Sequence, residues 1–197
     1  RNITQDSFLI NRIFVSLYIE YNKIEKYNHF LGKYVISEND KDYGEFIKVL
    51  LFLKSQDVED IKLEDMINLF EFVISPSDRI VTGAIYTPKN IRDYILERCL
   101  DTFPDLCDVR VADIACGCGG FLMDTAKTIH HKTNKSYYDI FRQNIYGIDI
   151  QSYSIERCTI LLNLLAVSDN EVADFDFNLL CADTLDFKSE IWDTYYS

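Results

Sequence analysis

Apolar positions in the first eighty residues recur with the period of an α-helix. Two runs show this spacing: Phe14, Leu17, Tyr18, Tyr21 and Ile24, and then Met66, Ile67, Phe70, Val73 and Ile74. The shorter apolar run EFIKVLLFL (45–53) is also predicted to be helical. Pro76 and Gly83 then break the pattern. We therefore predict a helical N-terminal region over residues 1–80 and a second domain over residues 81–197.

The second domain is predicted to open with a helix in GAIYTPKNIRDYILERCL (83–100). Thr87 is a favourable N-cap, and Pro88 suits the first helical position, where its missing N–H costs nothing. One face of this helix is predicted to be apolar and carries Ile91, Tyr94, Ile95 and Cys99.

From Val109 onward the pattern alternates between short apolar runs and helical periodicity. The runs VRVADIA (109–115), NIYGIDI (144–150) and FNLLCAD (177–183) are predicted strands, and residues 119–132 and 154–167 are predicted helices. The first run is of the apolar, β-branched kind that is buried on both faces of a parallel sheet. The alternation predicts an α/β fold, namely part of a doubly wound, Rossmann-like parallel sheet.

Composition narrows the class of protein. The chain is 48% hydrophobic, enough for a core, and holds no apolar run long enough to span a bilayer. Its net charge is −12 and no basic run exceeds two residues, so a nucleic-acid partner would have to be gripped mostly by parts outside this chain. None of the six cysteines forms a C-x-x-C pair, which favours free thiols in a reducing cytoplasm over disulfides or a metal site.

The stretch DIACGCGGFL (113–122) follows the first predicted strand and is rich in glycine. Such a turn lets a ligand approach the main chain, because glycine has no Cβ. The stretch lacks the lysine and hydroxyl of a nucleoside-triphosphate loop, and it does not have the G-x-G-x-x-G spacing of a dinucleotide site. The loop favours a nucleotide-like cofactor over a metal.

An aspartate stands near the end of each predicted strand: Asp113, Asp149 and Asp183. Ligands of α/β sheets bind at the carboxyl ends of the strands. A carboxylate after the second strand can accept both hydroxyls of a ribose, and one after the third can accept a hydrogen bond from an adenine amine. The alternative is that these aspartates cap the turns that follow them. Three at successive strand ends favour the cofactor.

The segments GAIYTP, DIACGCGGFL, YGIDI and CADTL resemble, in order and spacing, the motifs of the adenine-specific DNA methyltransferases of type I modification subunits and fused type II restriction–modification enzymes. The resemblance spans roughly residues 75–185. It implies S-adenosyl-L-methionine as cofactor and double-stranded DNA as substrate. It further implies a specificity subunit or fused nuclease as partner, in the bacterial cytoplasm and with no membrane.

The resemblance also implies roles for single residues. Thr87 and Pro88 would close over the methionine part of the cofactor, Asp113 would position the loop or reach the methionine amine, Asp149 would bind the ribose and Asp183 the adenine. The implied cofactor-binding residues are Tyr86, Thr87, Pro88, Asp113, Ala115, Gly117, Gly119, Phe121, Asp149, Ile150, Asp183 and Thr184. Ile114 and Cys118 depart from the family, which usually has Pro and then Ser or Thr there.

The family's catalytic motif, [DNS]-P-P-[YF], is missing. The chain has only three prolines, Pro76, Pro88 and Pro104, so no two are adjacent. We therefore name no catalytic residue and expect the gene to continue with a fourth strand and such a motif. Without that strand, the first strand would form a sheet edge, and the isolated chain is expected to self-associate or be marginally stable.

Two other functions stay open at this point. The glycine loop and the aspartates also suit a methyltransferase that acts on RNA, protein or a small molecule. The missing motif suits a non-catalytic docking or regulatory fragment.

Overall fold

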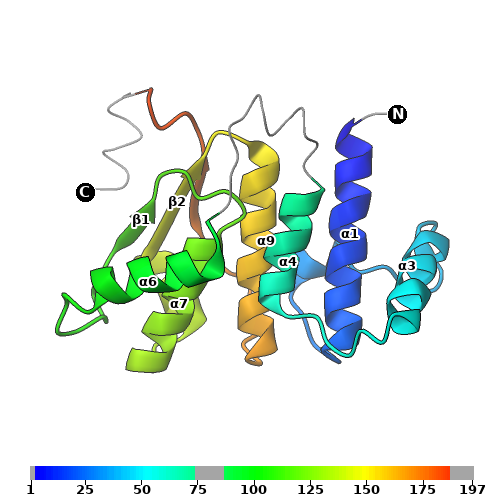
Figure 1. Cartoon of the computed structure of the whole chain (residues 1–197), viewed down its shortest axis with the longest axis horizontal. Coiled ribbons are helices and arrows are strands. Elements are labelled where there is room, and N and C mark those ends of the chain that lie inside the picture. The colour runs from blue at the N-terminus through cyan, green and yellow to red at the C-terminus, as the bar shows by residue number, and fades with distance from the viewer. Residues whose placement is uncertain (1–2, 74–86, 187–197) are drawn as a thin grey trace. The chain divides into compact units, whose positions relative to one another are not determined.

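The computed structural model describes residues 3–73 and 87–186, which fall into two compact units (Figure 1). The first unit combines residues 1–73 with residues 163–174, and the second combines residues 74–162 with residues 175–197. The predicted boundary between residues 80 and 81 lies outside the described residues. No described helix is both long enough and apolar enough to cross a membrane.

The first unit is helical. Its elements are α1 (Ile3–Tyr21), α2 (His29–Gly32), α3 (Tyr43–Ser55) and α4 (Leu63–Phe72). The three predicted helices are present, although α1 ends before Ile24, and Val73 is the C-cap of α4. The short α2 was not predicted.

Polar side chains reinforce the apolar core of this unit. Arg12, itself buried, pairs with Asp40 and Asp42 in the loop before α3. Asn28 donates from Nδ2 to Oδ1 of Asn163 (2.6 Å) and to the carbonyl of Ala173 (2.7 Å). These bonds tie the returning segment 163–174 to the N-terminal helices.

The second unit contains a parallel sheet in the order β1-β2-β3, with β1 (Val111–Asp113), β2 (Ile145–Asp149) and β3 (Asn178–Cys181). Val111 pairs with Ile145, and Asp149 pairs with Cys181. The predicted α/β class with parallel strands is confirmed, and each strand is shorter than predicted.

The prediction that the first strand is buried on both faces is wrong. Ala112 is exposed and Val111 is only half-buried. Within the described part of the chain β1 pairs with β2 alone, so it forms an edge of the sheet. Its apolar composition suits a central strand, but no described strand flanks it on the other side.

Four helices accompany the sheet: α6 (Lys89–Leu100), α7 (Gly120–Thr133), α8 (Tyr137–Gln143) and α9 (Ser152–Ser168). Helix α7 packs against β1 and β2, and α6 packs on α7 (Figure 1). This packing is close because β2 carries Gly147. A Cβ there would lie 2.7 Å from side-chain atoms of Leu122 and Leu179. Helix α8 was not predicted, although Ser136 caps it by accepting from the Asp139 N–H (3.1 Å).

Helix α6 differs from the prediction in its start and its buried face. It begins at Lys89, because Pro88 has an extended ψ of 147° and is the N-cap in place of Thr87. The buried residues are Arg92, Leu96 and Leu100. The predicted apolar face, with Ile91, Tyr94, Ile95 and Cys99, is exposed instead.

Candidate functional site

The glycine loop after β1 closes tightly on β2 and α9. Gly117 and Gly119 have φ of 54° and 90°, which side chains of L-residues rarely allow. A Cβ on Gly119 would lie 2.4 Å from Sγ of Cys158 in α9. The Cys116 N–H donates to the Ile148 carbonyl (2.9 Å), and the Gly119 N–H donates to the Cys116 carbonyl (2.8 Å). The loop therefore brings main chain to the end of β2.

Asp149, the last residue of β2, joins this loop to the next one. Its Oδ2 accepts from the Gly117 N–H (2.9 Å) and its Oδ1 accepts from the Gln151 N–H (2.8 Å). These two bonds fix the carboxylate at the carboxyl edge of the sheet. Each carboxylate oxygen can accept two hydrogen bonds, so the group can still accept from a ligand.

All three strand-end aspartates make the same local turn. Oδ1 of Asp113 accepts from the Ala115 N–H (3.2 Å), just as Asp149 accepts from Gln151, and Oδ1 of Asp183 accepts from the Leu185 N–H (2.9 Å). The capping role considered from the sequence is therefore real for each of them. The turn at Asp183 uses only Oδ1, so the second carboxylate oxygen of Asp183 has no hydrogen bond to the described residues.

Asp113 has an environment that favours the neutral carboxyl. Burial raises its pKa above the usual 3.8, and the nearby charge of Asp149 raises it further. The hydrogen bond from the Ala115 N–H opposes the shift. The two adjacent strand ends thus hold two carboxyls whose charges repel each other.

The loop after β3 also reaches the loop after β1. Oγ1 of Thr184 donates to the Ile114 carbonyl (2.6 Å), passing the end of β2. Ile150 lies next to Asp149 and is 58% exposed, so it offers an apolar surface beside the carboxylate. The three strand ends therefore form one continuous edge.

Two residues that the sequence did not indicate connect Thr87 to helix α7. Nε of Arg92 donates to Oδ2 of Asp124 in α7 (2.9 Å), and a terminal nitrogen of Arg92 donates to the Thr87 carbonyl (2.9 Å). Both side chains of this ion pair are buried. Nothing in the sequence signals a pairing between residues 32 positions apart.

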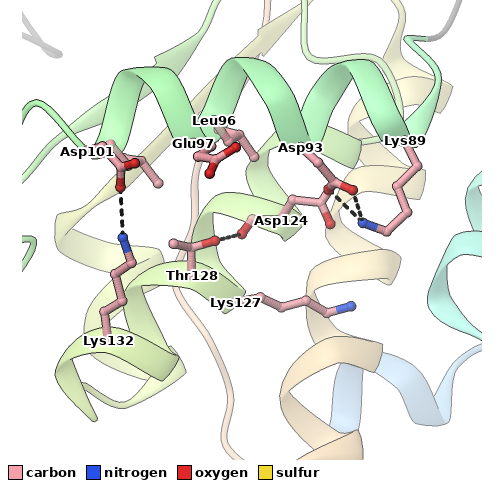
Figure 2. Close-up of a pocket in the computed structure, with 10 residues that line it drawn as sticks. Lys89, Asp93, Leu96, Glu97, Asp101, Asp124, Lys127, Thr128 and Lys132 are labelled. Carbon is pink, nitrogen blue, oxygen red and sulfur yellow. Dashed lines mark hydrogen bonds and ion pairs between the residues drawn. The ribbon is translucent and has the colours of Figure 1, made fainter.

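A pocket of about 490 Å³ lies between α6 and α7, and charged side chains from both helices line it (Figure 2). No residue of the described strands lines this pocket. It contains the ion pairs of Lys89 with Asp93 (2.6 Å) and Lys132 with Asp101 (3.3 Å). None of the predicted cofactor-binding residues lines it. We therefore place the candidate site at the strand ends.

The cysteines of the described chain are free thiols. Three of them are buried: Cys116 and Cys118 in the glycine loop, and Cys158 in α9. A hydrogen bond with Cys116, together with burial, raises the pKa of Cys158 well above its usual value, which keeps this thiol protonated. The described residues include no cluster of His, Cys, Asp or Glu suited to a metal ion.

The structure brings most of the predicted site residues to this one edge. Tyr86 lies outside the described residues, and Thr87 is held by Arg92, which pairs with Asp124 of α7. Pro88 is exposed, while Ala115 and Phe121 lie on the glycine loop and at the start of α7. That these residues bind a cofactor stays a prediction.

Fold and site together define a class of protein: an α/β domain with a glycine loop after its first described strand and an aspartate at or near the end of each described strand. The family model of the N-6 DNA methylases matches residues 62–195. The chain belongs to the N-6 DNA methylase family, whose cofactor is S-adenosylmethionine.

A solved structure of a Listeria monocytogenes protein, described as a class I S-adenosylmethionine-dependent methyltransferase, is similar over 90% of this chain. The two sequences are 17% identical and the TM-score is 0.40. This chain spans about half, 52%, of that structure. No curated protein matches the sequence.

Proposed function

We propose that the chain is the cofactor-binding part of a site-specific DNA adenine N6-methyltransferase of a restriction–modification system. The observation that carries the proposal is the position of the Asp149 carboxylate at the end of β2. The Gly117 N–H of the glycine loop and the Gln151 N–H hold this carboxylate in place. Asp149 lies within residues 62–195, which match the family model and also contain the ends of β1 and β3.

The residues present fit S-adenosylmethionine. Asp149 has free acceptor capacity for the two ribose hydroxyls, and exposed Asp183 has a free oxygen for the adenine amine. Ile150 offers an apolar surface between them. The positive-φ glycines let the loop bend so that the Gly117 N–H reaches the Asp149 carboxylate. When bound, the cofactor would supply an activated methyl group.

In this proposal the strand-end residues account for cofactor binding, but not for binding of the adenine base. A base must leave the duplex to meet a methyl donor, and it then needs stacking and hydrogen-bonding partners. No two prolines are adjacent in the 197 residues, so the family's acceptor motif is not among them. DNA contacts are proposed to come largely from other parts of the protein, because this chain carries a net charge of −12.

Two measurements on the 197-residue chain test the proposal. We expect calorimetric titration to show weak binding of S-adenosylmethionine and S-adenosylhomocysteine, and a labelled-methyl assay to show no transfer to DNA. Absence of binding would contradict the cofactor site. Transfer to DNA by this chain alone would contradict the proposal that the chain binds the cofactor but lacks the groups that receive the adenine.

A further inference from the structure

The Arg92 guanidinium is buried where α6, α7 and Thr87 meet. Its side chain is 3% exposed, and it donates hydrogen bonds to Oδ2 of Asp124 and to the Thr87 carbonyl, at 2.9 Å each. A Cβ on Gly120 would lie 3.2 Å from Nε of Arg92. The guanidinium therefore lies directly against the first residue of α7, and one side chain ties Thr87 to the start of that helix.

The order of the strands indicates which part of the cofactor lies there. The proposed function places the adenine at Asp183 after β3 and the ribose at Asp149 after β2. Because the sheet order is β1-β2-β3, the rest of the ligand extends toward β1 and the loop that leads into α7. The methionine part is therefore nearest to the start of α7, the place where Arg92 holds Thr87.

We propose that Arg92 and Asp124 are positioning residues for the methionine end of S-adenosylmethionine. They act through Thr87: Asp124 fixes the plane of the guanidinium, and the guanidinium holds the Thr87 carbonyl. An arginine suits this position because its rigid fork donates in two directions at once, which a lysine ammonium cannot do with the same geometry. The inference rests on the proposed function.

A purely structural ion pair would behave differently from a positioning pair. Loss of a structural pair weakens the whole pocket, and every ligand is affected alike. Loss of a positioning pair weakens only ligands that carry the methionine part. Two ligands separate these cases. S-adenosylhomocysteine carries the amino-acid chain of the methionine part, and 5′-methylthioadenosine lacks that chain.

The test is calorimetric titration of both ligands into the full chain and three variants. In Arg92→Lys, we expect affinity for S-adenosylhomocysteine to fall about tenfold, the scale of one charged hydrogen bond. Affinity for 5′-methylthioadenosine should stay within about twofold. A second variant, Arg92→Met with Asp124→Leu, removes both members of the ion pair together, which is less disruptive than the deletion of one member. It should show the same selective loss.

The matched control is Leu100→Ala on the same helix. Leu100 is 3% exposed, so its truncation loosens α6 without removing either bond of Arg92. Its ratio of the two affinities should equal that of the wild type. Parallel loss of both ligands in the Arg92 variants, an unchanged ratio, or a selective loss in the control would overturn the inference alone. A wild-type chain that binds neither ligand would overturn the proposed function and this inference together.

Discussion

Asp149 accepts two main-chain hydrogen bonds before any ligand arrives, so its carboxylate is already oriented. A preoriented group loses little conformational freedom on binding, and charge-assisted hydrogen bonds contribute about 1.5–3 kcal/mol each. We therefore expect Asp149→Ala to weaken binding of S-adenosylhomocysteine by at least about tenfold in calorimetry.

The matched comparison is Cys118→Ser. Cys118 is buried in the same loop, but the motif that this loop resembles has Ser or Thr at its position, so the change should alter affinity far less. Equal losses from the two variants would show that the ribose has been placed wrongly.

Gly119 is the second residue whose substitution gives a clear outcome. Alanine there would have a φ of 90° and a Cβ 2.4 Å from Sγ of Cys158. We expect Gly119→Ala to lower the free energy of unfolding by about 1–3 kcal/mol, from strain and overpacking together. Denaturant titration measures this change.

The combination with Cys158→Ala separates the two causes. Removing Sγ relieves the shortest contact but leaves the φ strain, so stability should recover in part. Gly44→Ala is the control, because a Cβ there meets nothing within 4 Å and the residue lies in helix α3. That change should be neutral or stabilising. A double variant no more stable than Gly119→Ala would exclude the contact with Cys158 as a cause.

At the scale of single elements, α6 provides the sharpest test. Its buried face carries Leu96 (8% exposed), whereas Ile95 beside it is 40% exposed. We expect Leu96→Ala to cost about 2–5 kcal/mol of stability and Ile95→Ala about 0.5 kcal/mol or less in denaturant titration. A larger loss of stability from Ile95→Ala than from Leu96→Ala would show that the face predicted from the sequence is the buried one.

Helix α6 also shows where sequence patterns stop being informative. The alternation of strands and helices could be read from the chain because buried parallel strands and amphipathic helices differ in period. The strand-end aspartates could also be predicted, because parallel strands place their carboxyl ends at one edge of the sheet. The buried face of α6 could not be predicted, because a buried arginine interrupts the apolar pattern and its partner Asp124 lies 32 residues away in the sequence.

Across the whole molecule, acid sensitivity is expected to depend on a pair in the first unit. The Arg12 side chain lowers the pKa of Asp40 to about 2 from 3.8. The stabilisation is fully present above pH 3.8 and is lost as the pH falls through about 2, because the unfolded chain binds the proton first. We expect Asp40→Asn to lower stability at pH 7 and to flatten the loss of stability between pH 4 and 2.

Denaturant titrations at several pH values check this expectation. Lys48→Ala is a suitable control, because it removes an exposed pair with Glu45 whose contribution is small. Wild type and Asp40→Asn with the same pH dependence would show that the pair with Arg12 does not persist in solution.

The first unit is completed by a stretch of chain that is synthesised long after its other residues. Residues 1–73 need residues 163–174, which supply Asn163 and Ala173 for Asn28 and the Ser168 hydroxyl for Tyr18. A ribosome adds about 5–20 residues per second, so roughly 5–20 s separate the two parts. During that interval the N-terminal helices have an open face that suits a chaperone. Residues 1–73 thus cannot complete these contacts until residues 163–174 have been made.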